Sequence, residues 1–223
     1  MNALNWLKSA IIGQYPLVKV RSNFDGRIYM VRDLPDKQAA ADLLSKVRLR
    51  LEQLCEVVQR KFPDKPQVKR MLANFRADPD RFLEATPDAK HTSYNVNKGE
   101  TIHLCLRQRN GSDESLVNEN VMIFVGIHEL AHTITKSVGH EPEFWNNFGW
   151  LLREAEAAGL YTHTDFRAQP VAYCGVSITD QPKYDPARDE AATGTTGPIG
   201  KTGGLGDILR IGQIVEERPA GGY

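Results

Sequence analysis

The run His128-Glu-Leu-Ala-His132 holds the residues whose types and spacing are best suited to chemistry. On a helix, His128 and His132 lie one turn apart and point the same way, so both imidazoles can bind one metal ion. Glu129 projects beside that ion, where its carboxylate can take a proton from a water molecule at the metal. The spacing therefore predicts a hydrolytic zinc site with Glu129 as the general base.

The segment around this run is apolar, which indicates that the three ionisable side chains are buried. Its flanking apolar residues are Val121, Ile123, Phe124, Ile127, Leu130, Ala131 and Ile134. A helix that is apolar on most of its faces is buried, and burying two histidines and a glutamate is costly unless a metal or ion partners are present. The alternative is a pair of histidines satisfied by hydrogen bonds, with Glu129 in a surface salt bridge.

A catalytic zinc ion usually has three protein ligands and leaves its fourth position to water. His140 is the first candidate for the third ligand, because Gly139 directly before it lets the chain turn back toward the metal. Glu154, on the following helix, is the competing candidate and stays open at this point. Either choice gives one zinc ion per chain.

The elements that position these residues follow from periodicity. We expect the metal-bearing helix at about residues 117–137 and its cap at Gly139. Residues 101–107 alternate like a half-buried strand, and the turn before them leads back to a second strand at 93–96. We expect 101–107 to be the edge of a small sheet lying over the helix, where an extended peptide could pair with it.

Further helices and a hairpin complete an α+β fold. Residues 17–33 are typical of a hairpin turning at an Asp-Gly pair. Residues 36–61 form a long amphipathic helix near the N-terminus, because their apolar residues recur at steps of three and four. A short helix at 68–75 precedes a polar loop that extends to residue 92, and a last helix covers 142–158.

Residues 1–186 are therefore expected to form one domain, and residues 187–223 a flexible Gly-rich tail. The 223 residues, with 41% hydrophobic residues, suit one globular domain with a substantial core. A formal net charge of zero removes the simplest argument for nucleic-acid binding. We interpret the basic residues of the long helix as a solvated face; they are Lys46, Arg48, Arg50, Arg60 and Lys61.

The cysteines and the N-terminal stretch indicate the compartment. Cys55, Cys105 and Cys174 are odd in number, widely separated and in no C-x-x-C pair. This pattern indicates neither a disulfide framework nor a cysteine zinc knuckle, and it favours a reducing compartment. Residues 4–20 are interrupted by polar residues before they reach membrane-spanning length and do not resemble a signal peptide. We therefore expect an intracellular protein.

Several motifs resemble those of a known group. His128-Glu-Leu-Ala-His132 followed by Gly139-His140-x-Pro142-Glu143-Phe144-Trp145 resembles the metallopeptidases of the WLM and SprT-like groups. Lys98-Gly99-Glu100, Leu104-Cys105-Leu106-Arg107 and Tyr173-Cys174-Gly175 are similar to elements of uncharacterised metallopeptidases of large DNA viruses. The resemblance implies a zincin-like fold, protein or peptide substrates, the ligands His128, His132 and His140, and Glu129 as the base. For a viral protein, the location would be the host cytoplasm, the nucleus or the virion.

Tyr173 is the last candidate. In the Tyr-Cys-Gly element it could lie close enough to the metal to donate a hydrogen bond to the oxyanion that develops during hydrolysis. The alternative is a packed tyrosine whose hydroxyl has a backbone partner.

Two other classes of function use the same residues. One is a non-catalytic, zinc-stabilised domain that binds nucleic acid or protein. Glu129 argues against it, because a structural zinc site needs no base. The other is an enzyme that cleaves cell-wall polymers, which the missing export signal disfavours. We therefore predict a zinc peptidase, and the sequence leaves its oligomeric state open.

Overall fold

The computed structural model describes residues 15–109 and 111–189. The helices are α2 (Lys37–Lys61), α3 (Pro66–Asn74), α4 (Glu119–Ile134) and α5 (Pro142–Ala157), with short 3₁₀ helices η1 (Pro79–Arg81) and η2 (Pro186–Arg188). The strands are β1 (Leu17–Arg21), β2 (Ile28–Arg32), β3 (Phe82–Glu84), β4 (Tyr94–Val96), β5 (Thr101–Leu104), β6 (Val171–Tyr173) and β7 (Val176–Ile178).

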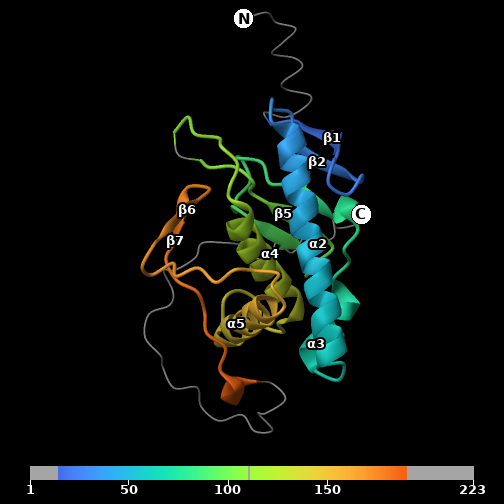
Figure 1. The fold of residues 1–223 in the computed structure, drawn as a ribbon, viewed down its shortest axis with the longest axis vertical. Coiled ribbons are helices and arrows are strands. Elements are labelled where there is room, and N and C mark those ends of the chain that lie inside the picture. Colours follow the sequence, from blue (N-terminus) through green and yellow to red (C-terminus); the bar gives the residue numbers. More distant parts are fainter. Residues whose placement is uncertain (1–14, 110, 190–223) are drawn as a thin grey trace, which may run out of the picture.

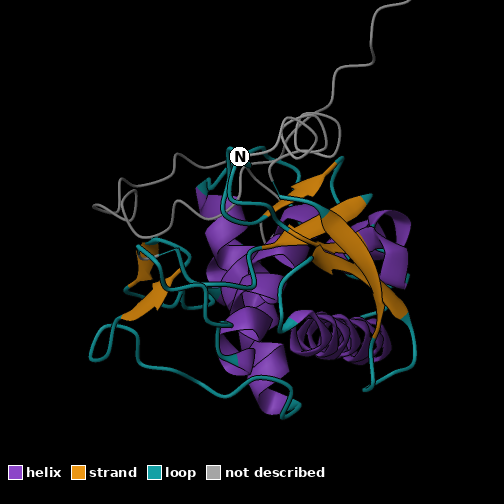
Figure 2. Ribbon diagram, turned by 90° about the horizontal axis from the view of Figure 1, so that it is seen from above, coloured by secondary structure: helices purple, strands orange, loops and turns teal. Residues whose placement is uncertain are grey.

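In both views the β6–β7 hairpin lies across the helices from β1 and β2 (Figures 1 and 2). Within these described ranges, no helix is both long and apolar enough to cross a membrane.

The first five strands form one mixed sheet in the order β1-β2-β3-β5-β4. β1 and β2 are antiparallel, which confirms the predicted hairpin, and Gly26 has a φ of +71° in its turn. β3 is parallel to both β2 and β5, whereas β4 is antiparallel to β5. Parallel neighbours need a long connection between them, and α2 and α3 supply the one from β2 to β3. The architecture is therefore α+β, as predicted.

The position of the edge strand differs from the prediction. β5 lies inside the sheet, between β3 and β4, and β4 is the outer strand beside α4. Asn97, Lys98 and Gly99 all have positive φ and form the tight turn that makes β4 a neighbour of β5. Because β3 pairs with one side of β5, β4 occupies the other side and becomes the edge. The expectation that 101–107 forms the edge is wrong, and the regular strand is shorter, ending at Leu104.

β3 lies in the polar segment for which the sequence predicts a loop. The Glu84 carboxylate, buried in this strand, accepts hydrogen bonds from the Arg32 backbone N–H (2.7 Å) and from Arg107 Nε (2.8 Å). Both partners are distant in the chain. The strand is therefore stabilised by its neighbours in the sheet, and three residues carry too little periodicity to reveal it.

α4 is buried on all sides from Val121 to Ile134. It packs against α2, α3 and α5, and against β4 and β5. Gly126 allows α2 to approach closely, since a Cβ there would lie 2.9 Å from Val47 Cγ1. The predicted helix is thus confirmed, but it ends at Ile134, so Gly139 lies in the following loop and does not cap the helix.

Arg48 does not lie on the solvated face to which the sequence assigned it. Its side chain is buried, and it donates from Nε to the Tyr29 hydroxyl (2.8 Å) and from Nη2 to the Asp25 carboxylate (3.2 Å). A hydrogen bond to the Ala77 carbonyl (2.9 Å) satisfies Nη1. Arg48 therefore joins α2 to the β1–β2 hairpin, which a helical-wheel argument on α2 alone could not show.

The chain after β7 returns to pack on α5. Gly149 lies at this contact, and Asp189 accepts hydrogen bonds from Lys65, Gln67 and Tyr184. The proposed Gly-rich tail of residues 187–223 lies, from residue 190 onward, outside the described residues.

We expect Gly149→Ala to destabilise the protein, although alanine is the better helix former by about 1 kcal/mol. An added Cβ would lie 2.8 Å from both Lys183 C and Tyr184 N. These are backbone atoms, so the segment must shift, and overpacking of this kind costs about 1–3 kcal/mol. The free energy of unfolding from urea titration should fall by about 1 kcal/mol. A rise would contradict the packing of residues 183–184 on α5.

Candidate metal centre

Three imidazoles converge at one point of the structure. His128 and His132 come from α4, and His140 comes from the loop between α4 and α5. One nitrogen of each ring lies within 4.8 Å of the others, and His128 Nε2 is 3.1 Å from His140 Nε2. His128 and His132 are buried, and His140 is partly exposed. Three imidazole nitrogens so close together can bind a metal ion and leave a position open on the exposed side.

The loop that carries His140 is fixed to the start of α5. The Glu143 carboxylate accepts hydrogen bonds from the backbone N–H groups of Lys136 (3.0 Å) and Ser137 (3.1 Å). Gly139 has a φ of +81°, a conformation that glycine adopts readily. Together these features turn the chain so that His140 faces α4.

Aromatic rings orient the histidines. Phe144 stacks on His132 with the ring centroids 4.3 Å apart, and Trp145 lies 5.4 Å from His140. Burial lowers the pKa of His140 to about 4. Its ring is therefore neutral at neutral pH and offers the lone pair that a metal needs.

Glu154 is not part of this cluster. Its carboxylate is paired with Lys61 (3.0 Å) and Arg153 (2.7 Å). Of the two candidates that the sequence left open, the geometry favours His140.

Glu129 is buried beside the histidines. Its Oε2 accepts a hydrogen bond from Asn95 Nδ2 (3.1 Å), whereas its buried Oε1 has no hydrogen-bond partner among the described residues. Burial raises the pKa of Glu129 to about 8, and the Asn95 hydrogen bond offsets part of that rise. A cation at the neighbouring histidines would lower it again.

Asn95 is a site residue that was not predicted from the sequence. The alternation of strand 93–96 offered a signal, because Asn95 is a polar residue on the strand face that must turn toward the apolar helix.

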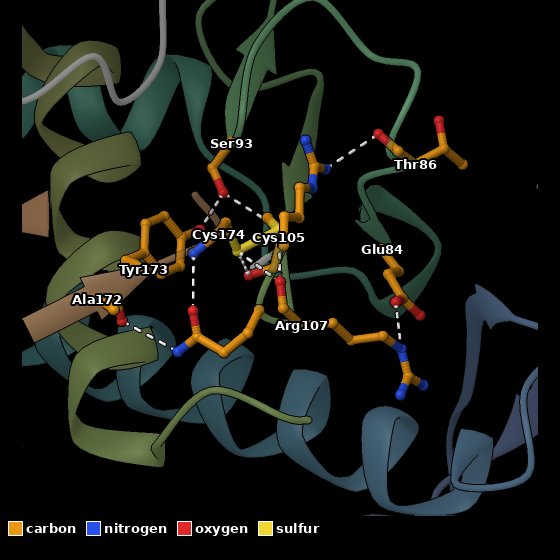
Figure 3. Close-up of a disulfide and its surroundings, with 10 residues drawn as sticks. Glu84, Thr86, Ser93, Cys105, Arg107, Ala172, Tyr173 and Cys174 are labelled. Carbon is orange, nitrogen blue, oxygen red and sulfur yellow. Dashed lines mark hydrogen bonds and ion pairs between the residues drawn. A yellow bond between two sulfur atoms is a disulfide. The ribbon is translucent and has the colours of Figure 1, made fainter. Parts of the chain in front are cut away.

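Tyr173 is buried and reaches the same region from β6. Its hydroxyl shares a 2.5 Å hydrogen bond with Ser93 Oγ, which also accepts from the Cys105 backbone N–H (2.9 Å) (Figure 3). Burial holds the pKa of Tyr173 above its usual value, and the charge of Glu129 adds to that rise.

A disulfide between Cys105 and Cys174 anchors this part of the molecule (Figure 3). It ties the chain just after β5 to the turn of the β6–β7 hairpin. Gln108 adds two hydrogen bonds, to the Ala172 carbonyl (3.0 Å) and from the Cys174 N–H (3.1 Å). The sequence indicated no disulfide framework, and this bond corrects that expectation; Cys55 is a buried free cysteine. Its two cysteines are 69 residues apart, so spacing in the sequence gave no sign of the pair.

The chain is similar to several known proteins. The family model described as "WLM domain" matches residues 23–210. An uncharacterised protein of Acanthamoeba polyphaga mimivirus is 32% identical over 165 residues, covering 72% of this chain and 82% of the viral protein. A Schizosaccharomyces pombe protein named "DNA-dependent metalloprotease WSS1 homolog 2" is 25% identical over 72% of this chain and 49% of its own length. A crystal structure of a Wss1 mutant from Saccharomyces cerevisiae has a TM-score of 0.38 at 22% identity, covering 58% of this chain and 90% of that one.

Metal binding distinguishes the two candidates for the third ligand. His140→Ala removes one of the three clustered nitrogens, so we expect zinc affinity, measured by competition with a chromogenic chelator, to fall by more than about 100-fold. Glu154→Gln should leave zinc affinity unchanged, because its carboxylate is engaged by Lys61 and Arg153. The reverse pattern would assign the third ligand to Glu154.

Proposed function

The chain belongs to the WLM domain family, and from that membership we propose that it is a zinc-dependent peptidase that hydrolyses peptide bonds of protein substrates. One observation carries the proposal: three clustered imidazoles lie beside a buried carboxylate of the same helix. A structural zinc site needs no such carboxylate. The non-catalytic binding domain is therefore the less favoured reading.

The donor set fits zinc. His128, His132 and His140 offer three nitrogen ligands in a mostly buried setting, and one ion per chain satisfies all three. When bound there, zinc would polarise a substrate carbonyl and make a water molecule more acidic. Mg²⁺ and Ca²⁺ fit less well, because they prefer oxygen ligands.

Glu129 would act as the general base. Its carboxylate would take a proton from the attacking water and deliver it to the leaving amine. The low polarity around Glu129 is what raises its pKa, and this makes the protonated form accessible for the second step. Burial lowers the pKa of His140 to about 4, so its ring is neutral at neutral pH and does not take up the proton that Glu129 transfers.

The substrate would pair with β4 in a zincin-like arrangement. Among the described residues β4 is paired on one side only, with β5. An extended peptide on its other side would gain main-chain hydrogen bonds. Because β4 packs against α4, such a peptide would lie along the metal-bearing helix.

Tyr173 is the second group that we infer to act in the reaction. Its hydroxyl is buried and bonded to Ser93, and it would donate a hydrogen bond to the oxygen on which negative charge develops.

Replacement of Glu129 should separate catalysis from metal binding. Glu129→Gln keeps the size of the side chain but cannot accept the proton, so turnover of an unbiased peptide library should fall by about 100-fold or more. Zinc content and melting temperature should stay near wild type. Each reaction is run with and without added DNA, since the fission yeast relative is named as DNA-dependent. A Glu129→Gln variant with nearly full activity would refute the mechanism, and an inactive, zinc-loaded wild type would favour the binding domain.

Tyr173→Phe tests the oxyanion role. It removes only the hydroxyl, so we expect kcat to fall by about 10-fold or more while KM changes little. Ser93→Ala is the matched control for the shared hydrogen bond, because it keeps the tyrosine hydroxyl. Equal activity of Tyr173→Phe and wild type would make Tyr173 a packing residue.

A further inference from the structure

β4 turns one fully buried side chain toward the metal-bearing helix. Asn95 has no exposed surface, whereas its neighbours Tyr94 and Val96 are partly exposed on the other face of the sheet. A buried carboxamide is costly unless it is hydrogen-bonded. Its partners should therefore explain why it is there.

Both contacts of the Asn95 amide are with one residue. Nδ2 donates to the Glu129 carboxylate at Oε2 (3.1 Å) and to the Glu129 backbone carbonyl (3.3 Å). A backbone carbonyl only accepts hydrogen bonds, so the NH₂ group of Asn95 faces Glu129. The Asn95 amide thus binds α4 at Glu129, the residue that transfers the proton in the proposed mechanism.

This contact makes the two carboxylate oxygens unequal. Oε2 is engaged by Asn95, and the buried Oε1 has no hydrogen-bond partner among residues 15–109 and 111–189. Rotation about the last side-chain bond of Glu129 would exchange the oxygens, and the Asn95 amide opposes that rotation.

We propose that Asn95 is the positioning residue of the general base, holding Glu129 by Oε2 so that Oε1 is the oxygen that exchanges the proton. This inference rests on the proposed peptidase function. Strand β4 would then do two things: its backbone would align the substrate, and its Asn95 side chain would orient Glu129. Substrate and base then share one rigid element, which fixes their relative position.

The first test compares Asn95→Ala with the loss of another asparagine from the turn that follows β4. Asn97→Gly removes an exposed carboxamide bonded to Glu100, and glycine accepts the φ of +46° there. We expect Asn95→Ala to lower kcat by about 10- to 100-fold, with KM and zinc content within about twofold of wild type. Asn97→Gly should match wild type. Asn95→Leu, which keeps the volume without a donor, should repeat the kcat loss if the alanine variant folds poorly.

The second test asks whether Asn95 acts through Glu129. In a Glu129→Gln background, Asn95→Ala should cost no more than about a further twofold in kcat, since a positioned base is no longer present. In metal-free protein, the side-chain amide resonances of Asn95 should shift on Glu129→Ala and not on Asn97→Gly. If the kcat losses of Asn95→Ala and Glu129→Gln were additive, Asn95 would not act through Glu129. Loss of zinc together with kcat in Asn95→Ala would likewise overturn the positioning role.

The two proposals fail in different ways. Full kcat in both Asn95 variants, with an inactive Glu129→Gln, would overturn the positioning role and leave the peptidase standing. A zinc-loaded wild type that cleaves nothing would overturn the peptidase and the positioning role with it, even if the Asn95 resonances respond to Glu129→Ala.

Discussion

The burial of α4 on every side is the constraint on which the site depends. His128, Glu129 and His132 are all withdrawn from water by the helices and strands around them. Polar groups in such a setting must be met by groups from other segments. His140 lies in the loop after α4 and faces His128, and Asn95 lies in the edge strand β4 and binds Glu129. The loop after α4, the sheet edge and the start of α5 therefore meet beside the polar side chains of this helix.

The parts of the molecule that were predictable are those governed by local rules. The helices at α2, α4 and α5 follow from apolar periodicity, and the β1–β2 hairpin follows from an Asp-Gly turn. The pairing of His128 with His132 needs only the pitch of a helix. His140 was harder, since a loop has no fixed geometry, but a glycine directly before it marked the turn. The resemblance to WLM proteins, which the family match confirms, drew on the same motifs.

The parts that were missed depend on partners far away in the chain. β3 exists because β2 and β5 flank it, and Arg48 is buried because the β1–β2 hairpin folds over it. The order of β4 and β5 was reversed in the prediction because an alternating pattern gives the inward face of a strand but not its neighbours. Asn95 was overlooked for the same reason: its role depends on which helix lies beneath the strand.

The Cys105–Cys174 bond closes a ring of polypeptide that contains α4, the His140 loop and α5. A single cut anywhere inside that ring leaves both pieces covalently joined, whereas a cut before Cys105 or after Cys174 releases a fragment. After a cut within the ring, the disulfide keeps the two pieces at a high effective concentration, so their reassociation is intramolecular. A break near the histidine cluster is thus retained on one molecule for as long as the two sulfurs stay bonded.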